Sequence, residues 1–185
     1  MEQSFFNRIN KLLKGRSIFL IGMMASGKSK TGPKLAQLLN YKFIDVDNLV
    51  EKIAQKSISN IFEEDGENIF RDLESKCLQE IIQLHSVVVS TGGGIITKKM
   101  NWGFLRQGIV IWLDIEHNVA LTRLKADRNQ RPLLKSEDID QEYIAIYNLR
   151  KELYDQADIT IKVGNQTVEE VSMKIIHALE NNIKS

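Results

Sequence analysis

The chain has little of several features that define other classes of protein. Of its 185 residues only one is cysteine, Cys77, so no intrachain disulfide is possible. Two residues are proline and no stretch is rich in proline or serine, which argues against an internal linker or a second domain. No apolar run approaches the roughly 20 residues needed to cross a bilayer. We therefore expect one domain that does not enter a membrane.

A surplus of charge is also missing. Lysine and arginine number 25 against 24 aspartates and glutamates, for a formal net charge of +1. This balance gives no general electrostatic reason to expect nucleic acid or an anionic membrane as a partner. The apolar residues near the amino end are interrupted by Arg8 and Lys11, so residues 1–16 make a poor secretory signal. We expect a helical extension there and a cytoplasmic protein, and in the absence of a heptad pattern we expect a monomer.

Short apolar runs alternate with longer stretches of helical periodicity along the rest of the chain. Such alternation predicts βαβ units and a parallel sheet covered on both faces. We predict an α/β fold, a doubly wound sheet of about five strands, as a single domain over residues 17–185. In such sheets the site lies beyond the carboxyl ends of the strands. The predicted strands are residues 18–21, 41–46, 87–89, 108–113 and 159–163.

The first predicted strand leads into a full match to the phosphate-loop pattern G-x-x-x-x-G-K-[ST], at residues 22–29. Its glycines let successive N–H groups point inward at phosphate oxygens, and the helix that follows adds its positive end. Such a pattern also arises by chance in a glycine-containing turn, but the strand before it and the helix after it favour a phosphate site. The predicted nucleotide-binding residues in this loop are Ala25, Ser26, Gly27, Lys28, Ser29 and Lys30.

Two carboxylates, Asp45 and Asp47, close the second apolar run. Residues two apart in a strand point to the same face, so both side chains should project together above the phosphate loop. Aspartate is also common in solvated turns, which is the plainer explanation for either residue alone. Beside a phosphate loop, two acids suit one position near a metal and one on the acceptor hydroxyl.

Two arginines and a glycine run complete the pattern. Arg71 and Arg150 each stand on a predicted helix beside apolar positions, where a guanidinium can grip a carboxylate or phosphate with two hydrogen bonds. A solvated surface arginine is the commoner fate of either residue taken singly. Residues 92–94, including Gly93 and Gly94, follow the third predicted strand, where glycine lets the backbone approach a ligand closely.

A charged segment lies between two predicted helices. It is basic from Arg123 to Arg131 and polar through residues 135–138. We interpret it as a mobile lid, at about residues 126–139, with Arg131 pointed at the transferred phosphate. The alternative is a charged surface loop.

These motifs occur in the order seen in one family. The phosphate loop, D-x-D, G-E-x-x-F-R-x-x-E, G-G-G, R-P-L-L and R-x-x-L-Y make the chain resemble the shikimate kinases, from about residue 18 to the last helix. The resemblance implies a P-loop NTPase fold like that of nucleoside monophosphate kinases. It also implies transfer of the ATP γ-phosphoryl group to the 3-hydroxyl of shikimate, within aromatic amino-acid biosynthesis.

The resemblance further implies a role for each site residue. On the nucleotide side, Lys28 and the loop backbone hold phosphates, Ser29 and Asp45 serve Mg²⁺, and Arg131 lies over the phosphates. Arg123 stacks on adenine, and residues 163–167 form the adenine loop.

On the acceptor side, Asp47 holds the shikimate hydroxyls and is the candidate base. Arg71 and Arg150 clamp the carboxylate of shikimate, and the backbone of Gly93 and Gly94 closes the pocket. The implied partners are thus shikimate and ATP.

Two other functions are the alternatives at this point. Another small-acid P-loop kinase, such as a gluconate kinase, would also use paired arginines, but the D-x-D, G-G-G and R-P-L-L motifs favour a shikimate kinase. A non-catalytic module that binds shikimate could keep the fold while losing Lys28, Asp47 or Arg131. All three residues are present, which favours an enzyme.

Overall fold

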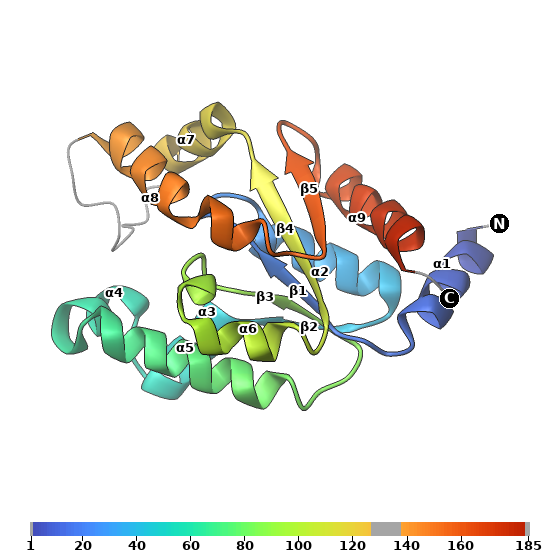
Figure 1. Ribbon diagram of the computed structural model, residues 1–185, viewed down its shortest axis with the longest axis horizontal. Coiled ribbons are helices and arrows are strands. Elements are labelled where there is room, and N and C mark those ends of the chain that lie inside the picture. Colours follow the sequence, from blue (N-terminus) through green and yellow to red (C-terminus); the bar gives the residue numbers. More distant parts are fainter. Residues whose placement is uncertain (1, 127–137, 184–185) are drawn as a thin grey trace.

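The structure, a computed structural model, describes residues 2–126 and 138–183. Within these residues a parallel sheet of five strands carries helices on both faces, which confirms the predicted α/β fold (Figure 1). The strands lie in the order β2-β3-β1-β4-β5. Their bounds are β1 Ile18–Ile21, β2 Lys42–Asp45, β3 Val87–Ser90, β4 Ile109–Ile115 and β5 Ile159–Val163.

The helices divide between the two faces according to the direction in which the chain crosses the sheet. From β1 the chain moves outward to β2, and from β2 it returns through β3 and β4 to β5. Since parallel crossovers are right-handed, α2 covers one face, where α9 and α1 join it, whereas α5, α6 and α8 cover the other. The helices are α1 Glu2–Leu13, α2 Lys28–Leu39, α3 Val46–Ala54, α4 Ile58–Asn60, a π-helical turn Ile61–Asp65, α5 Glu67–Ile81, a 3₁₀ turn Ile95–Thr97, α6 Lys99–Leu105, α7 His117–Ala126, α8 Ile139–Tyr154 and α9 Val168–Asn182.

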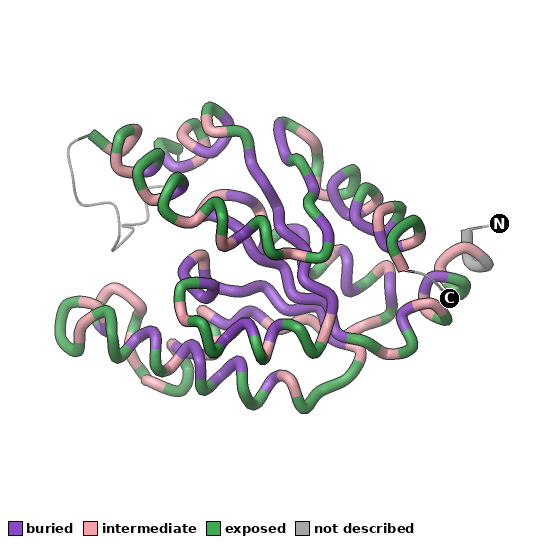
Figure 2. The backbone as a smooth tube through the Cα atoms, viewed as in Figure 1, coloured by how far each residue is buried: buried purple, intermediate pink, exposed green. Residues whose placement is uncertain are grey.

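The hydrophobic core is centred on the inner strands of the sheet. Every residue of β1, β3 and β4 is buried, as expected for parallel strands covered on both faces (Figure 2). The edge strand β5 instead alternates between buried and exposed residues. Strand β4 ends at Ile115, two residues beyond the predicted end, and so includes the buried Asp114. Its carboxylate accepts a hydrogen bond from the Tyr147 hydroxyl at 3.2 Å and pairs with Lys162.

Helix α1 packs across α2 and α9 at the end of the molecule where the two termini lie (Figure 1). Ile9 and Leu13 are fully buried in this contact, and Arg8 forms an ion pair with Glu180 of α9. The helix therefore shares the core of the domain. The division of the chain at residue 16 stays a prediction. Over the described ranges, no helix is both long and apolar enough to cross a membrane.

Candidate active site

Three loops meet at the carboxyl edge of the sheet. The phosphate loop follows β1, Asp45 closes β2, and the glycine loop, residues 92–94, follows β3 shortly after Ser90. The register aligns them, since Ser90 stands opposite both Leu20 of β1 and Asp45 of β2. The sheet thus brings together residues that are up to about 70 positions apart in sequence, and it does so at the edge where parallel sheets carry their sites.

The phosphate loop has the backbone conformation that its pattern predicts. Gly27 takes a left-handed φ of 92° just before α2, and Gly22 takes a φ of 143° with no room for a side chain beside the Leu113 carbonyl. Ala25 also adopts a left-handed φ, of 63°, which costs an L-residue about 1 kcal/mol. This strain is confined to one position of the loop.

Lys28 is buried, and its Nζ donates hydrogen bonds to the carbonyls of Gly22 at 2.8 Å and Met23 at 2.9 Å. These contacts hold the ammonium group against the inside of the loop.

Hydroxyl and carboxylate oxygens gather beside the loop. Ser29 Oγ lies 3.2 Å from Ser90 Oγ, and Asp45 is the cross-strand neighbour of Ser90. Hard oxygen ligands of this kind suit Mg²⁺, which commonly keeps several waters and binds through one or two protein groups plus phosphates. Within residues 2–126 and 138–183 no cluster of three acidic, histidine or cysteine side chains could cage a metal instead. The donor set fits Mg²⁺ in the manner of a P-loop enzyme.

The two aspartates do not share a strand face, and that part of the prediction is wrong. Strand β2 ends at Asp45, whose carboxylate caps α3 by accepting hydrogen bonds from the N–H groups of Asp47 at 3.1 Å and Asn48 at 3.3 Å. Asp47 therefore lies in the first turn of a helix. The capping interaction satisfies N–H groups that would otherwise have no partner, so the helix starts one residue after the strand.

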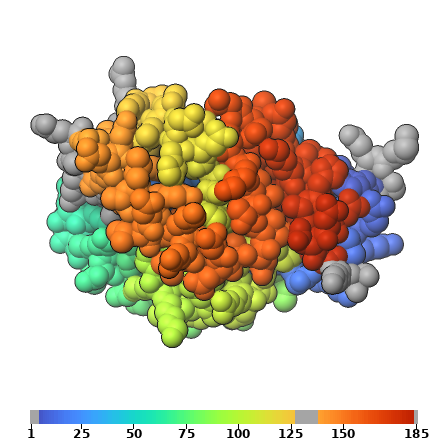
Figure 3. Space-filling view, turned by 45° about the horizontal axis from the view of Figure 1, so that its top comes forward, coloured from blue at the N-terminus to red at the C-terminus, as the bar shows by residue number. Residues whose placement is uncertain are grey.

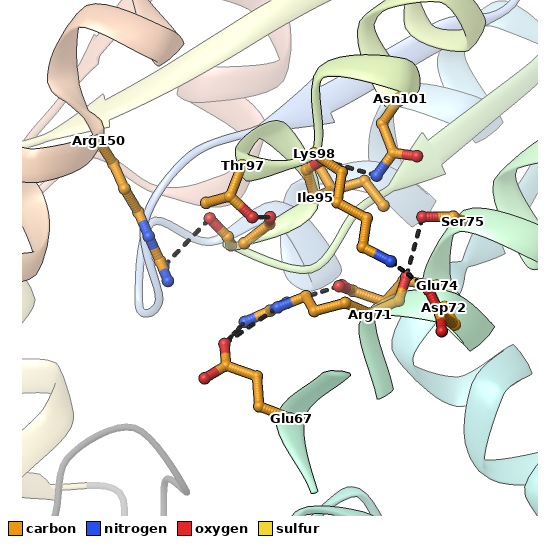
Figure 4. Close-up of polar contacts among 12 residues, drawn as sticks. Glu67, Arg71, Asp72, Glu74, Ser75, Ile95, Thr97, Lys98, Asn101 and Arg150 are labelled. Carbon is orange, nitrogen blue, oxygen red and sulfur yellow. Dashed lines mark hydrogen bonds and ion pairs between the residues drawn. The ribbon is translucent and has the colours of Figure 1, made fainter. Parts of the chain in front are cut away.

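The Arg71 side chain is buried and held by two glutamates of its own helix, α5. It donates to Glu74 at 2.5 Å, and its Nη2 and Nε atoms donate to Glu67 at 2.9 and 3.1 Å (Figure 4). Burial opposes the charge on Arg71, but the interactions with Glu74 and Glu67 outweigh it and raise the pKa of the guanidinium. Arg71 is thus a fixed cation rather than a solvated surface residue.

Glu74 is fully buried beside this cation. Burial raises its pKa to about 7, Arg71 and Arg150 oppose the rise, and Asp47 adds to it. Among the described residues, its Oε1 atom has no hydrogen-bond partner. A Cβ added to Gly92 would lie 2.1 Å from Oε1 of Glu74 and 2.9 Å from Oδ1 of Asp47. The two carboxylates therefore converge on the glycine loop.

The second arginine reaches the glycine loop from α8. Arg150 Nη1 donates to the Gly93 carbonyl at 3.3 Å, as does the Tyr154 hydroxyl at 2.5 Å. Figure 4 shows Arg150 and Arg71 extending from different helices toward the segment that contains this loop. Gly94 lies directly on Arg71, where an added Cβ would be 2.3 Å from the guanidinium carbon. The glycine loop thus lies between the two predicted clamp residues.

Arg123 joins two loops of the nucleotide side. Its Nη1 donates to the Ala25 carbonyl and its Nη2 to the Gly164 carbonyl, both at 3.1 Å. The phosphate loop is thereby tied to the predicted adenine loop, whereas stacking of Arg123 on adenine stays a prediction. Arg131 and residues 127–137 of the predicted lid lie outside the described residues.

Three further residues belong to this arrangement and were not assigned a role from the sequence. Glu74 is the last residue of the G-E-x-x-F-R-x-x-E motif and Tyr154 is the last residue of R-x-x-L-Y, and in both motifs the predicted role fell on the arginine alone. Ser90 directly precedes Thr91 and the glycine run and is 1% exposed. Its position at a strand's carboxyl end was the available signal.

Comparison with known proteins identifies the arrangement. The family model described as shikimate kinase matches residues 24–180. The chain belongs to the shikimate kinase family. A shikimate kinase of Prochlorococcus marinus (strain NATL2A) is 48% identical over 179 residues, which cover 97% of this chain and 90% of that protein.

Solved structures agree with the family assignment. A shikimate kinase from Acinetobacter baumannii in complex with shikimate superposes with a TM-score of 0.88 at 34% identity, covering 95% of this chain and 99% of that one. A gluconokinase from Sinorhizobium meliloti has a TM-score of 0.55 at 18% identity and shares the fold alone. The alternative of a gluconate kinase thus has fold-level similarity, whereas the shikimate kinase family matches in sequence as well.

Proposed function

We propose that this protein transfers the γ-phosphoryl group of ATP to the 3-hydroxyl of shikimate, giving shikimate 3-phosphate and ADP. One observation carries the proposal. A phosphate loop and two arginines from separate helices approach the same glycine loop, Arg71 against Gly94 and Arg150 on Gly93. This arrangement suits a substrate that carries a carboxylate and must present a hydroxyl to a nucleotide.

Each residue has a task in the proposed reaction. The phosphate-loop N–H groups and Lys28 bind and orient the phosphates and offset their charge. Asp47 accepts a hydrogen bond from the acceptor hydroxyl, and it positions that hydroxyl and receives its proton as the new O–P bond forms. Arg71 and Arg150 bind the carboxylate of the acceptor and fix its orientation. Phosphoryl transfer depends mostly on such positioning and charge neutralisation.

Ser29 and Asp45 would hold Mg²⁺, directly or through water. When bound, the ion would neutralise charge on the β- and γ-phosphates. The cytoplasm as location and the monomer as working form belong to the same proposal. The absence of a heptad pattern in the sequence supports the monomer.

A coupled assay of ADP release tests the function, with shikimate and gluconate as alternative acceptors in the presence of ATP and Mg²⁺. Turnover that requires shikimate and is absent with gluconate is the expected result. Preference for gluconate would assign the protein to another small-acid kinase. Shikimate binding in calorimetry without any ADP release would instead indicate a non-catalytic module.

A further inference from the structure

The backbone of Gly93 is a junction between the two halves of the site. On one side it packs on the phosphate loop, where an added Cβ would lie 3.4 Å from the Gly22 carbonyl oxygen and 3.5 Å from the Met24 nitrogen. On the other side its carbonyl accepts hydrogen bonds from Arg150 and Tyr154, both of α8. These two hydrogen bonds fix the Gly93 peptide on the side of the acid clamp, so loss of one of them should affect the clamp first.

Tyr154 is the more firmly fixed of the two donors. Its side chain is fully buried at the last residue of α8, and its ring stacks on Trp112 of β4 with centroids 5.6 Å apart and planes at 15°. The hydroxyl lies 2.5 Å from the Gly93 oxygen, against 3.3 Å for Arg150. Arg150, by contrast, is a long side chain with several rotatable bonds and an expected role on the substrate.

The hydroxyl of Tyr154 stays a donor at all working pH values. Burial raises its pKa to about 12, although Arg150 opposes the rise. The ring could stack on Trp112 without its oxygen, so the oxygen itself contributes the hydrogen bond to Gly93. In the space-filling view, α8 (orange) lies between α7 (yellow) and the yellow-green segment that includes α6 (Figure 3).

We infer that Tyr154 is a positioning residue for the acceptor substrate. Its hydroxyl holds the Gly93 carbonyl, and this contact sets the glycine loop and Arg150 in the geometry that binds the acid. Tyr154 acts through Gly93 and Arg150 and contacts neither the phosphates nor the acceptor. The inference rests on the proposed function, since it assigns the residue a part in binding the acid substrate.

A matched pair of variants on one helix tests it. Tyr154→Phe keeps the ring and removes one oxygen. Tyr143→Phe makes the same change at another fully buried tyrosine of α8, whose hydroxyl has no hydrogen-bond partner among the described residues. Loss of a buried hydrogen bond typically changes an equilibrium constant by about a factor of ten, whereas loss of an unpaired hydroxyl changes it little.

We expect Tyr154→Phe to raise the KM for shikimate on the order of tenfold and to leave the KM for ATP within about twofold. Tyr143→Phe should match the wild type in both constants. Thermal unfolding of the two variants checks that each is folded. Incorporation of 4-aminophenylalanine at position 154 restores an N–H donor and should recover most of the shikimate affinity, a rescue that a purely structural role of the ring does not predict.

Three results would overturn the inference. They are an unchanged KM for shikimate in folded Tyr154→Phe, an equal rise in both KM values, and an effect of Tyr143→Phe as large as that of Tyr154→Phe. Failure of the proposed function is a separate observation, because there the wild type itself would release no ADP with shikimate, and the role of Tyr154 would fail with it.

Discussion

Replacement of Gly94 by alanine tests the acid clamp through sterics alone. Gly94 has φ −101° and ψ 0°, which alanine can adopt, so the backbone itself is not strained by the change. The added Cβ would lie 2.3 Å from the Arg71 guanidinium carbon and 2.4 Å from both of its Nη atoms. Because carbon atoms in contact lie about 3.5–4.0 Å apart, the guanidinium must move by roughly 1 Å or more.

The structure allows that movement only at a cost. Arg71 is buried and donates a hydrogen bond to Glu74, which is itself fully buried. A displaced guanidinium would therefore leave the Glu74 carboxylate without its cation. We expect overpacking to lower the free energy of unfolding by about 1–3 kcal/mol. Loss of a hydrogen-bonded charge contact to the substrate costs about 2–5 kcal/mol, so the KM for shikimate should rise on the order of a hundredfold. The KM for ATP should change little.

Gly103→Ala is the matched control. Gly103 lies in α6, where an added Cβ would meet nothing within 4 Å, so this variant should gain about 0.5–1 kcal/mol of stability and keep both KM values. Steady-state kinetics with each substrate varied in turn, together with thermal unfolding, measures both effects. A Gly94→Ala protein with the wild-type KM for shikimate would refute the placement of Arg71 against the glycine loop.

Three further predictions concern charged residues. Lys28→Met should lower kcat at least a hundredfold with little change in the melting temperature, since the ammonium offsets phosphate charge during transfer. In Mg²⁺ titrations, excess Mg²⁺ should partly restore Asp45→Asn but not Asp47→Asn; the opposite pattern would mean that the roles are reversed. The pKa of Glu74 rises from 4.5 to about 7 on folding, so between these pH values the native state holds a proton that the unfolded chain has lost. The free energy of unfolding therefore falls as the pH rises from 4.5 to about 7. Glu74→Gln should flatten that decline in melting temperature, and an unaltered slope would contradict the raised pKa.

The sheet and the phosphate loop could be predicted from the sequence because both depend on local pattern. Short apolar runs predicted the strands, and β1 and β5 have the predicted bounds. Polar residues limited the accuracy at strand ends. Asp114 was taken to lie past the end of a strand, but Tyr147 and Lys162 satisfy its carboxylate, so β4 continues through it. That compensation comes from residues more than 30 positions away and has no local signal.

The aspartates illustrate a second limit. A carboxylate at the end of a strand is equally a good helix N-cap, and the choice decides whether the residue two positions later shares its direction. Asp45 caps α3, so the direction of the Asp47 side chain is set by the geometry of a helix and not by that of a strand. The apolar residues Leu49, Val50 and Ile53 that follow have helical spacing and were the available sign of a helix start.

The glycine loop was predicted as a close approach of backbone to ligand, but its three glycines first make room for protein groups. Gly92 makes room for the Glu74 carboxylate, Gly93 packs on the phosphate loop, and Gly94 lies on the Arg71 guanidinium. Glu74 and Arg71 belong to α5, whereas the neighbour of Gly93 is the phosphate loop after β1. A glycine run thus predicts that other atoms lie close to the backbone, but it does not predict which residues these atoms belong to. Since two of these neighbours are charged groups of the site, side chains on this loop would displace the groups expected to bind the substrate, even where the backbone conformation tolerates them.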